Sequence, residues 1–583
     1  MSKLFDDSSL AMIPSAVKDG RLYSIKPVEQ LGSELVTNGD FVTDGSWNGS
    51  KTIANGQLTK TSTGLVYQNS IDTSVKEYHI IIDVETKAGA GLTAYLGGTQ
   101  KALNEGVNTF YMKSGGSNAF VGFNNGSGSV FNSISVKEVL VNGDFTFSRG
   151  SNLAATRVDV NGLIEKGREN LLLQSNQFDT TWSSINTTET SGQADKDGGT
   201  DAWLISKSAS GARVQQAISV TGVQTFSVYA KANASNWIAL WTNVGTSYFD
   251  LSSGTKGSTG ASTTIGSAME SVGNGWYRCS LIFNTSISNV RIYPADGDLD
   301  TSGTSGSVYI QDAQLEQGLV ATDYIETGAS TAQAGILEDL PRLDYSGGAS
   351  CPALLLESQR SNLIDNSEYL TSGNWGKTQL IATQNQASSP EGLINSVKII
   401  DTSFSGEHYL ERSVSAAAGS YSFSVFAKAD TLEEILLRPV HINANEGATS
   451  QVGFSLQGEG SITTSIPPHC TASIEPYGNG WYRCVINISI TGASITQIRH
   501  RIQITKDGSL NYAGSGEGVF VYGAQVEAGS YPTSYIPTMG SAVTRSRDAV
   551  SITGVQTNEL IGSNQGSFVF RYWWIHGRLR AFM

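Results

Sequence analysis

Four sequence motifs occur twice along this chain in the same order, and this repetition constrains the fold more than any other feature. The motif Gly-Asn-Gly-Trp-Tyr-Arg-Cys stands at residues 273–279 and returns at 478–484. The interval between matched motifs grows along the chain, as expected when insertions lengthen loops while strands are kept. We therefore predict two copies of one module. The other three pairs are Asn-Leu followed by Trp at 170–182 and 362–375, Phe-Ser-Val-Tyr/Phe-Ala-Lys-Ala at 226–232 and 423–429, and a strand ending in Ala-Gln-Leu/Val-Glu at 308–316 and 519–527.

The repeats divide the chain into segments. A shorter and more divergent relative precedes the two copies, because Glu34–Phe41 followed by Trp47 parallels the opening of each module. A length of 583 residues agrees with three to five domains. The predicted segments are an N-terminal segment at 1–32, module one at 33–142, a connector at 143–168, module two at 169–328, a connector at 329–360, module three at 361–538 and a C-terminal segment at 539–583.

The local patterns predict an all-β chain. Phe226–Lys231 alternates large apolar residues with small or polar ones at a period of two, which is typical of a half-buried strand. The Asn274-Gly275 pair is a tight-turn signal, since both residues tolerate positive φ. Many such strands in each module favour tandem antiparallel β-sandwiches of the jelly-roll type. The one helical expectation is a turn or two at Ala332–Leu340.

Charge and hydropathy exclude several partners. The formal net charge of −14 disfavours nucleic-acid binding through a basic face. No stretch approaches ~20 consecutive apolar residues, so no membrane span is predicted. The start at Met1–Asp7 lacks a basic region followed by an apolar segment, so we expect assembly in a cytoplasm. The four cysteines are expected to be buried thiols, although Cys470 and Cys484 could meet across neighbouring strands.

The connectors resemble those of bacteriophage fibre and spike proteins. The first carries Phe145–Ser151, then Ala155-Thr-Arg157 and Gly162–Glu165, before Asn170–Ser175. The second carries Pro341–Tyr345, Cys351-Pro352 and Leu354–Arg360. In that family such segments join carbohydrate-binding-module-like jelly rolls. The resemblance implies a virion structural protein on the virion surface, commonly a homotrimer, whose N-terminal region contacts other virion proteins.

The C-terminal segment departs from this family. Glu559–Phe570 resembles the first strand of a lectin-like sandwich, and the aromatic, basic run Arg571–Met583 follows it. Two explanations stay open: a further domain lost downstream, or a natural terminal strand or trimerisation tip.

The motifs of catalysis are missing. The six histidines show no metal-ligand spacing, and the chain has no nucleophile elbow and no phosphate-binding loop. We therefore expect a protein that is not an enzyme and requires no cofactor. The repeated Gly-Asn-Gly-Trp-Tyr-Arg segment is predicted to be a hairpin with core aromatics, in preference to a sugar platform. Trp182 and Trp375 are predicted to fill the sandwiches.

The ligand candidates are Trp237 and Trp241. In a strand these residues share a face with Ala239 between them, which suits a flat platform for a glycan. Module three has Ile435–Pro439 in the corresponding region, without tryptophan, so the pair is not a shared core requirement. The alternatives are an interchain contact or core packing.

Two acidic loops are candidate sites for a structural calcium ion. Asp296, Asp298 and Asp300 place three carboxylates at alternate positions, but without the glycine and terminal glutamate of an EF-hand loop. Asp195 and Asp197 belong to the other loop. Solvated structural turns are the alternative for both.

The expected function is weak multivalent adhesion of a head or tail fibre to host-surface polysaccharide, where three chains with several sites each add avidity. The first alternative is an architectural head-decoration fibre without a ligand. The second is a glycan-degrading tailspike whose catalytic domain is lost or not recognised.

Overall fold

The structure is a computed structural model that describes residues 11–18, 21–26, 30–43, 45–89, 91–141, 144–150, 153–260, 264–348, 352–442, 450–491, 495–551, 571–575 and 578–582. All the regular elements in these ranges are strands, so the all-β prediction is confirmed. None of the described residues belongs to a helix that is long and apolar enough to cross a membrane. The chain divides into two compact units, one with residues up to Thr146 and one with Phe147–Ala549.

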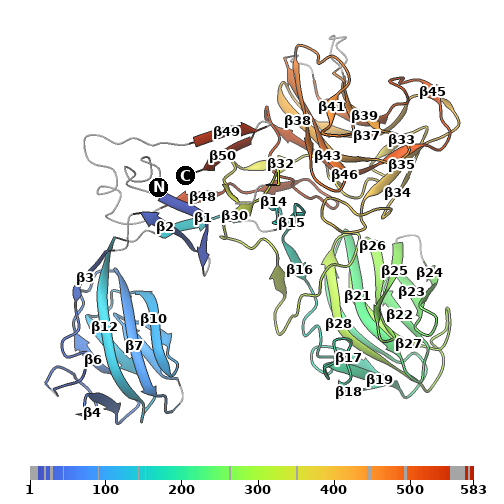
Figure 1. Cartoon of the computed structure of the whole chain (residues 1–583). Coiled ribbons are helices and arrows are strands. Elements are labelled where there is room, and N and C mark those ends of the chain that lie inside the picture. Colours follow the sequence, from blue (N-terminus) through green and yellow to red (C-terminus); the bar gives the residue numbers. More distant parts are fainter. Residues whose placement is uncertain are drawn as a thin grey trace. The chain divides into compact units, whose positions relative to one another are not determined.

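Module one is a sandwich in the first unit (Figure 1). Its core contains Trp47, which lies 5.7 Å from Phe123, centroid to centroid. One sheet runs β10 (Gly106–Lys113), β7 (Glu77–Thr86), β12 (Val130–Val141), β5 (Gln57–Lys60) and β4 (Lys51–Ala54), with β3 (Gln30–Glu34) on β12. The other runs β6 (Val66–Asn69), β11 (Phe120–Asn124), β8 (Thr93–Leu96) and β9 (Thr99–Ala102). In the same unit β1 (Ala11–Lys18) and β2 (Arg21–Lys26) form a hairpin.

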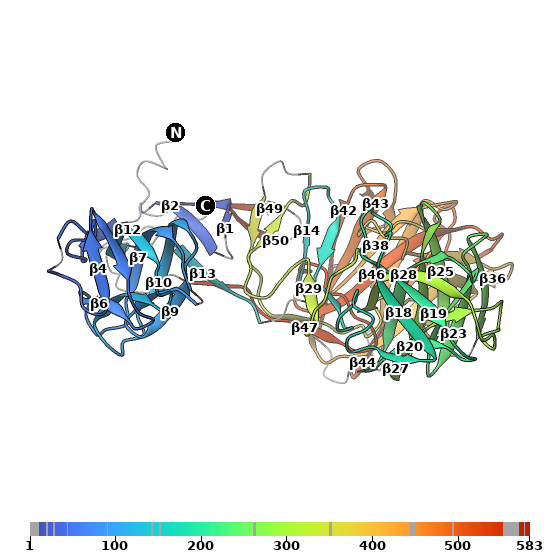
Figure 2. The ribbon, with the colours of Figure 1, turned by 90° about the horizontal axis from the view of Figure 1, so that it is seen from below.

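Modules two and three, in the second unit, have the same strand order in both of their sheets. In module two, one sheet runs β17 (Ser183–Ile185), β20 (Arg213–Val220), β27 (Ile287–Ala295), β22 (Trp237–Thr242), β23 (Gly245–Asp250) and β24 (Thr255–Gly260). The other sheet runs β18 (Thr187–Gln193), β19 (Ala202–Lys207), β28 (Ser307–Gln317), β21 (Val223–Ala232), β26 (Trp276–Asn284) and β25 (Thr264–Gly273). Figure 2 shows several of these strands from below.

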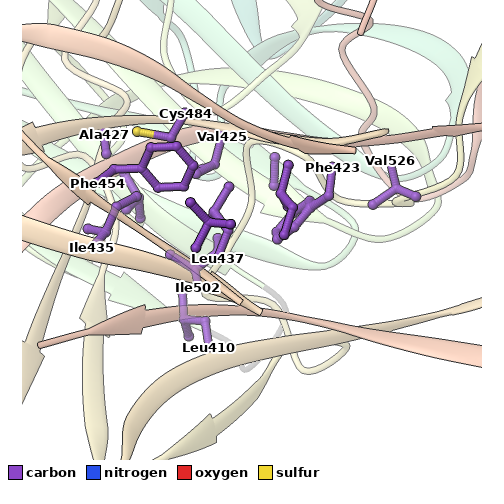
Figure 3. Packing of buried hydrophobic residues seen from close by; sticks show 14 of the residues in the cluster. Leu410, Phe423, Val425, Ala427, Ile435, Leu437, Phe454, Cys484, Ile502 and Val526 are labelled. Carbon is purple, nitrogen blue, oxygen red and sulfur yellow. The ribbon is translucent and has the colours of Figure 1, made fainter. Parts of the chain in front are cut away.

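The sheets of module three follow the same path. One sheet runs β33 (Gly376–Thr378), β37 (His408–Ser415), β44 (Gln497–Ile504), β39 (Glu434–Ile442), β40 (Val452–Ser455) and β41 (Ser461–Ile462). The other sheet runs β34 (Leu380–Thr383), β35 (Val397–Asp401), β46 (Gly518–Ala528), β38 (Gly419–Ala429), β43 (Trp481–Ile490) and β42 (Cys470–Pro476). Inward residues of both sheets, such as Phe423, Leu437 and Phe454, meet in one apolar core (Figure 3).

One tryptophan has the same role in all three modules. Trp47, Trp182 and Trp375 are buried in the three cores, which confirms the prediction for the latter two. Each indole Nε1–H donates to a backbone oxygen eight or nine residues earlier, at 3.1, 3.1 and 2.9 Å. The shared hydrogen bond indicates that the divergent first module opens in the same way as the two repeats.

Short strand pairs close modules two and three at their bases. β16 (Arg168–Asn170) pairs with β29 (Ala332–Ala334), and β32 (Arg360–Asn362) pairs with β47 (Val543–Arg545). The helical turn predicted at Ala332–Leu340 is therefore wrong in its first residues. The backbone of Ala332–Ala334 pairs with the strand Arg168–Asn170 and does not form the local hydrogen bonds of a helix.

Both connectors contain a short hairpin. These are β14 (Thr156–Val158) with β15 (Ile164–Lys166), and β30 (Arg342–Asp344) with β31 (Ala353–Leu355). The two hairpins bind each other, since Arg342 donates to the Thr156 carbonyl at 2.8 Å and Val158 N–H donates to Asp344 at 2.9 Å. β49 (Arg571–Ile575) and β50 (Arg578–Phe582), from the C-terminal segment, add to β31. The strand predicted at 559–570 lies outside the described residues.

The described cysteines are thiols. Cys279, Cys470 and Cys484 are buried and unbonded, and burial raises the pKa of each thiol. Cys470 lies opposite Ile488, and Cys484 lies opposite Ile474, so the two cysteines on β42 and β43 do not face each other.

Candidate functional site

Four aromatic side chains gather on the outer face of one sheet of module two. Trp237 and Trp241 lie on β22, Tyr248 lies on β23 and Tyr293 lies on β27. Tyr293 forms a buried cluster with Ala239 and Ala295, and the other three rings pack against this cluster. Ala239 is directly opposite both Tyr248 and Tyr293 in the strand register. We call this set the aromatic face.

The alternation of β22 explains why the tryptophans point away from the core. Ile238 and Leu240 are fully buried inside the sandwich, so the residues between them must lie on the opposite side of the sheet. Trp237 and Trp241 are half-buried there. The structure thus brings together the pair singled out from the sequence, on the side of the sheet that is not core.

Two guanidinium groups border the aromatic face. The Arg291 Cζ lies 3.7 Å from the centroid of the Trp241 ring, and Arg291 Nη1 donates to the Tyr293 hydroxyl at 3.2 Å. The Arg213 Cζ lies 5.8 Å from the Tyr293 centroid, and its Nε donates to Gln215 at 2.9 Å. Stacking of a guanidinium on an aromatic ring fixes its plane and leaves its N–H groups pointing outward along that plane.

The Trp237 end of the face has the opposite charge. Asp298 lies there, held by the Ser258 backbone N–H and hydroxyl at 2.8 Å each. Gly257 allows this approach, because a Cβ at that position would lie 2.7 Å from the Trp237 ring and 2.5 Å from Asp298. Burial and then the Asp298 charge raise the pKa of Tyr248, so its phenol remains a hydrogen-bond donor at neutral pH.

The same face of module three carries none of these aromatics. Register pairs place Leu240 and Ile292 of module two at the positions of Leu437 and Ile502. Since the strands continue in step, the positions of the aromatic face are taken in module three by Glu434, Arg438, Gly453 and Gln503. The scaffold therefore does not require the aromatic face.

Sequence reasoning missed Tyr248, Tyr293 and the two arginines. A signal was present, because Arg291-Ile-Tyr293 aligns with Arg501-Ile-Gln503 and differs only at the aromatic position. It carries meaning only once β27 is known to lie beside β22.

The two acidic loops are built as turns. Asp195 accepts the backbone N–H groups of Asp197, Gly199 and Asp201 at 2.8–3.1 Å, and Asp197 pairs with Lys196. Asp296 pairs with Lys207 at 2.5 Å, and Asp298 holds Ser258.

Asp300 accepts from Ser302 at 2.7 and 2.8 Å. In the part of the chain that the structure describes, no three His, Cys, Asp or Glu side chains are grouped to hold a metal ion. The geometry thus favours the structural-turn alternative, and calcium stays a prediction.

The repeated Gly-Asn-Gly-Trp segment forms a hairpin with buried aromatics in both modules, as predicted. Asn274 and Gly275 have φ of 53° and 78°, and Asn479 and Gly480 have 51° and 77°. Trp276 and Trp481 are each 1% exposed. These tryptophans cannot offer a surface to a sugar.

A cavity of about 520 Å³ lies where the first connector meets modules two and three. Lys166 lies at its wall, with Nζ 2.9 Å from Glu368 and 2.7 Å from Glu391. Burial opposes each of these charges. The two carboxylates nevertheless raise the pKa of Lys166, and the ammonium lowers that of Glu391, whereas burial raises that of Glu368. The side chains already bind one another, so we regard the cluster as a structural junction.

Comparisons with known proteins add little to this geometry. No protein-family model and no curated protein matches the chain. Among solved structures, the tandem CBM51 modules of Sp3GH98, a family 98 glycoside hydrolase from Streptococcus pneumoniae SP3-BS71, show 12% identity and a TM-score of 0.15 over 66% of this chain and 100% of that one. A GH78 family rhamnosidase of Bacillus sp. GL1 shows 9% identity and a TM-score of 0.10 over 79% and 55%. At these TM-scores neither likeness carries a functional argument.

Proposed function

We propose that this chain is a non-enzymatic structural protein of a phage fibre or spike, and that the aromatic face of module two attaches it to glycans on the host surface. The likeness of the connectors to phage fibre proteins supports the structural part. The aromatic face supports the adhesive part, and it is the observation that carries the proposal.

The aromatic face has the properties of a sugar-binding surface. It combines half-buried indole rings with a few polar groups of fixed direction, which is the usual make-up of a ligand site. Ring faces of Trp237 and Trp241 offer contact with the C–H face of a pyranose, while the Tyr248 phenol and the Arg291 guanidinium offer donors to its hydroxyl groups. A homotrimer would present three such faces and gain avidity.

The double variant Trp237→Ala/Trp241→Ala tests the adhesive role. We expect it to lose binding by about tenfold or more on a glycan array, because two aromatic anchors are removed from the centre of the surface. The matched control is Tyr409→Ala, which removes an aromatic side chain from the equivalent sheet of module three. There the Arg501 Cζ lies 4.1 Å from the centroid of the Tyr409 ring. Circular dichroism must show that both variants fold.

Three outcomes would contradict the proposal. Equal array binding by the wild type and the tryptophan variant would place the ligand elsewhere. A tryptophan variant that changes the oligomer mass in light scattering, with no change in glycan binding, would make the face an interchain contact. Clearing of polysaccharide by the purified chain would favour an enzyme.

A further inference from the structure

Among the residues that the structure describes, the arginines of the aromatic face have no carboxylate partner, and this bears on the class of glycan. This inference rests on the proposed function and deepens it. Within the described ranges neither Arg213 nor Arg291 forms an ion pair with a carboxylate. Their recorded hydrogen bonds go to neutral groups instead: Gln215 and the Gly211 carbonyl for Arg213, and Asn289 and Tyr293 for Arg291.

In module three, carboxylates of the protein itself neutralise the equivalent arginine. Arg501 occupies the position of Arg291, and its Nε lies 2.6 Å from Glu411 while its Nη1 lies 3.4 Å from Glu407. Glu411 is directly opposite Arg501 in the register, just as Gln215 is opposite Arg291. Module two thus keeps the arginine and replaces the carboxylate that neutralises it with an amide.

The neighbouring position differs in the same direction. Four residues before Glu411 stands Glu407, which also binds Arg438 at 2.7 Å, whereas four residues before Gln215 stands Gly211. Both carboxylates of the module-three network are therefore missing around Arg291. Two uncompensated guanidinium groups beside the rings Trp241 and Tyr293 are left to the solvent side of module two.

We infer that the ligand of the aromatic face is an acidic glycan, and that a carboxylate of one sugar residue binds beside Tyr293, between Arg213 and Arg291. A guanidinium presents paired N–H donors that match the two oxygens of a carboxylate. Asp298, at the Trp237 end, repels a second carboxylate there, so the charged sugar lies over Trp241 and a neutral one over Trp237.

The charge of the whole chain sharpens this expectation. A protein with a formal net charge of −14 repels an acidic polymer at long range. Attraction must therefore come from the contact surface itself, and the loss of the two arginines should abolish selectivity for acidic over neutral glycans as well as weaken binding.

The experiment compares native polygalacturonate, alginate and hyaluronan with the carboxyl-reduced, neutral form of each polymer, by calorimetry and on an array with further acidic and neutral glycans. The wild-type full chain should bind at least one acidic glycan about tenfold more tightly than its reduced form, since hydrogen bonds to charged groups carry the difference. Arg213→Gln/Arg291→Gln should lose about tenfold on that acidic glycan and much less on its reduced form, so that the preference for the acidic form disappears. The control Arg501→Gln in module three should change neither the affinity for the acidic glycan nor the affinity for its reduced form.

The outcomes separate the two proposals. The acidic-glycan inference is overturned if the wild type binds only neutral glycans, or if the arginine variant binds the acidic glycan as tightly as the wild type does. In either case, weaker binding by the Trp237→Ala/Trp241→Ala variant still upholds the aromatic face as the binding surface. Binding that is insensitive to the tryptophan variant, or absent for every glycan on the array, overturns both.

Discussion

A buried asparagine opens each of the two full modules, and its amide holds the end of the module to its beginning. The Asn362 amide nitrogen donates to the Ala524 and Ile536 carbonyls at 3.2 and 2.9 Å, and its oxygen accepts from Ile364 and Val526 at 3.1 Å each. Asn170 makes the same four hydrogen bonds in module two. The repetition of Asn-Leu was visible in the sequence, but its cause was not, because the partners lie far along the chain.

Replacing Asn362 should therefore destabilise module three strongly. In Asn362→Ala four buried backbone groups lose their partner, and we expect a loss of about 3 kcal/mol in the free energy of unfolding. Urea unfolding followed by fluorescence measures it. Asn374→Ala, whose exposed amide donates to Asp365, is the control and should change stability by less than about 0.5 kcal/mol. Equal effects of the two changes would show that the four hydrogen bonds do not matter.

Strands and turns were the most predictable level of this molecule. The period of two at Phe226–Lys231 predicted correctly that Phe226, Val228 and Ala230 enter the core. The other face of β21 is more buried than expected of a half-buried strand, since Ser227 is fully buried as well. The aromatic face was only half predictable, since Trp237 and Trp241 share one strand whereas Tyr248 and Tyr293 join them through register across β23 and β27. The error at Ala332 has the same origin, as its pairing partner precedes it by a whole module.

The hairpin between β42 and β43 tests the turn assignment. Gly480 has a φ of 77°, a conformation that costs a residue with a side chain about 1 kcal/mol. Gly480→Ala should thus lower the thermal midpoint of module three by a few degrees in calorimetry. Gly373→Ala offers a match in the same module, because its φ is not in the left-handed region and a Cβ there meets nothing within 4 Å. A loss of stability equal to that of Gly480→Ala would argue against backbone strain as the cause.

At the scale of the second unit, the first connector belongs to module three. Ile164 N–H donates to the Pro390 carbonyl at 2.8 Å, and the Thr156 hydroxyl donates to the Tyr535 carbonyl at 2.6 Å. The identity of the partner could not be read from the sequence, because a connector is expected to touch the module that follows it directly.

Lys166 joins the first connector to module three through two buried ion pairs. Lys166→Met would bury Glu368 and Glu391 without a cation, and we expect a loss of about 3–5 kcal/mol at pH 8. The control is Arg157→Gln on the same hairpin, whose half-buried pair with Glu165 is worth at most about 1 kcal/mol.

The loss in the free energy of unfolding caused by Lys166→Met should become smaller as the pH falls. The ammonium lowers the pKa of Glu391 against the effect of burial, so its stabilisation is fully present above the unfolded pKa of about 4.5 and is lost as the pH falls through the lower pKa of the folded state. Urea unfolding at pH 8 and about pH 3 measures the difference. A defect of the same size at both pH values would contradict the assignment of this energy to the buried carboxylates.

The strand pair that closes module two has a consequence for how such a chain can change. Arg168–Asn170 and Ala332–Ala334 lie side by side, so the polypeptide enters and leaves this sandwich at a single point. Both flanking hairpins are fastened to each other, outside it. Module two is thus a separate unit inserted into a continuous chain, and evolution can exchange it for another sandwich without rebuilding the rest of the protein.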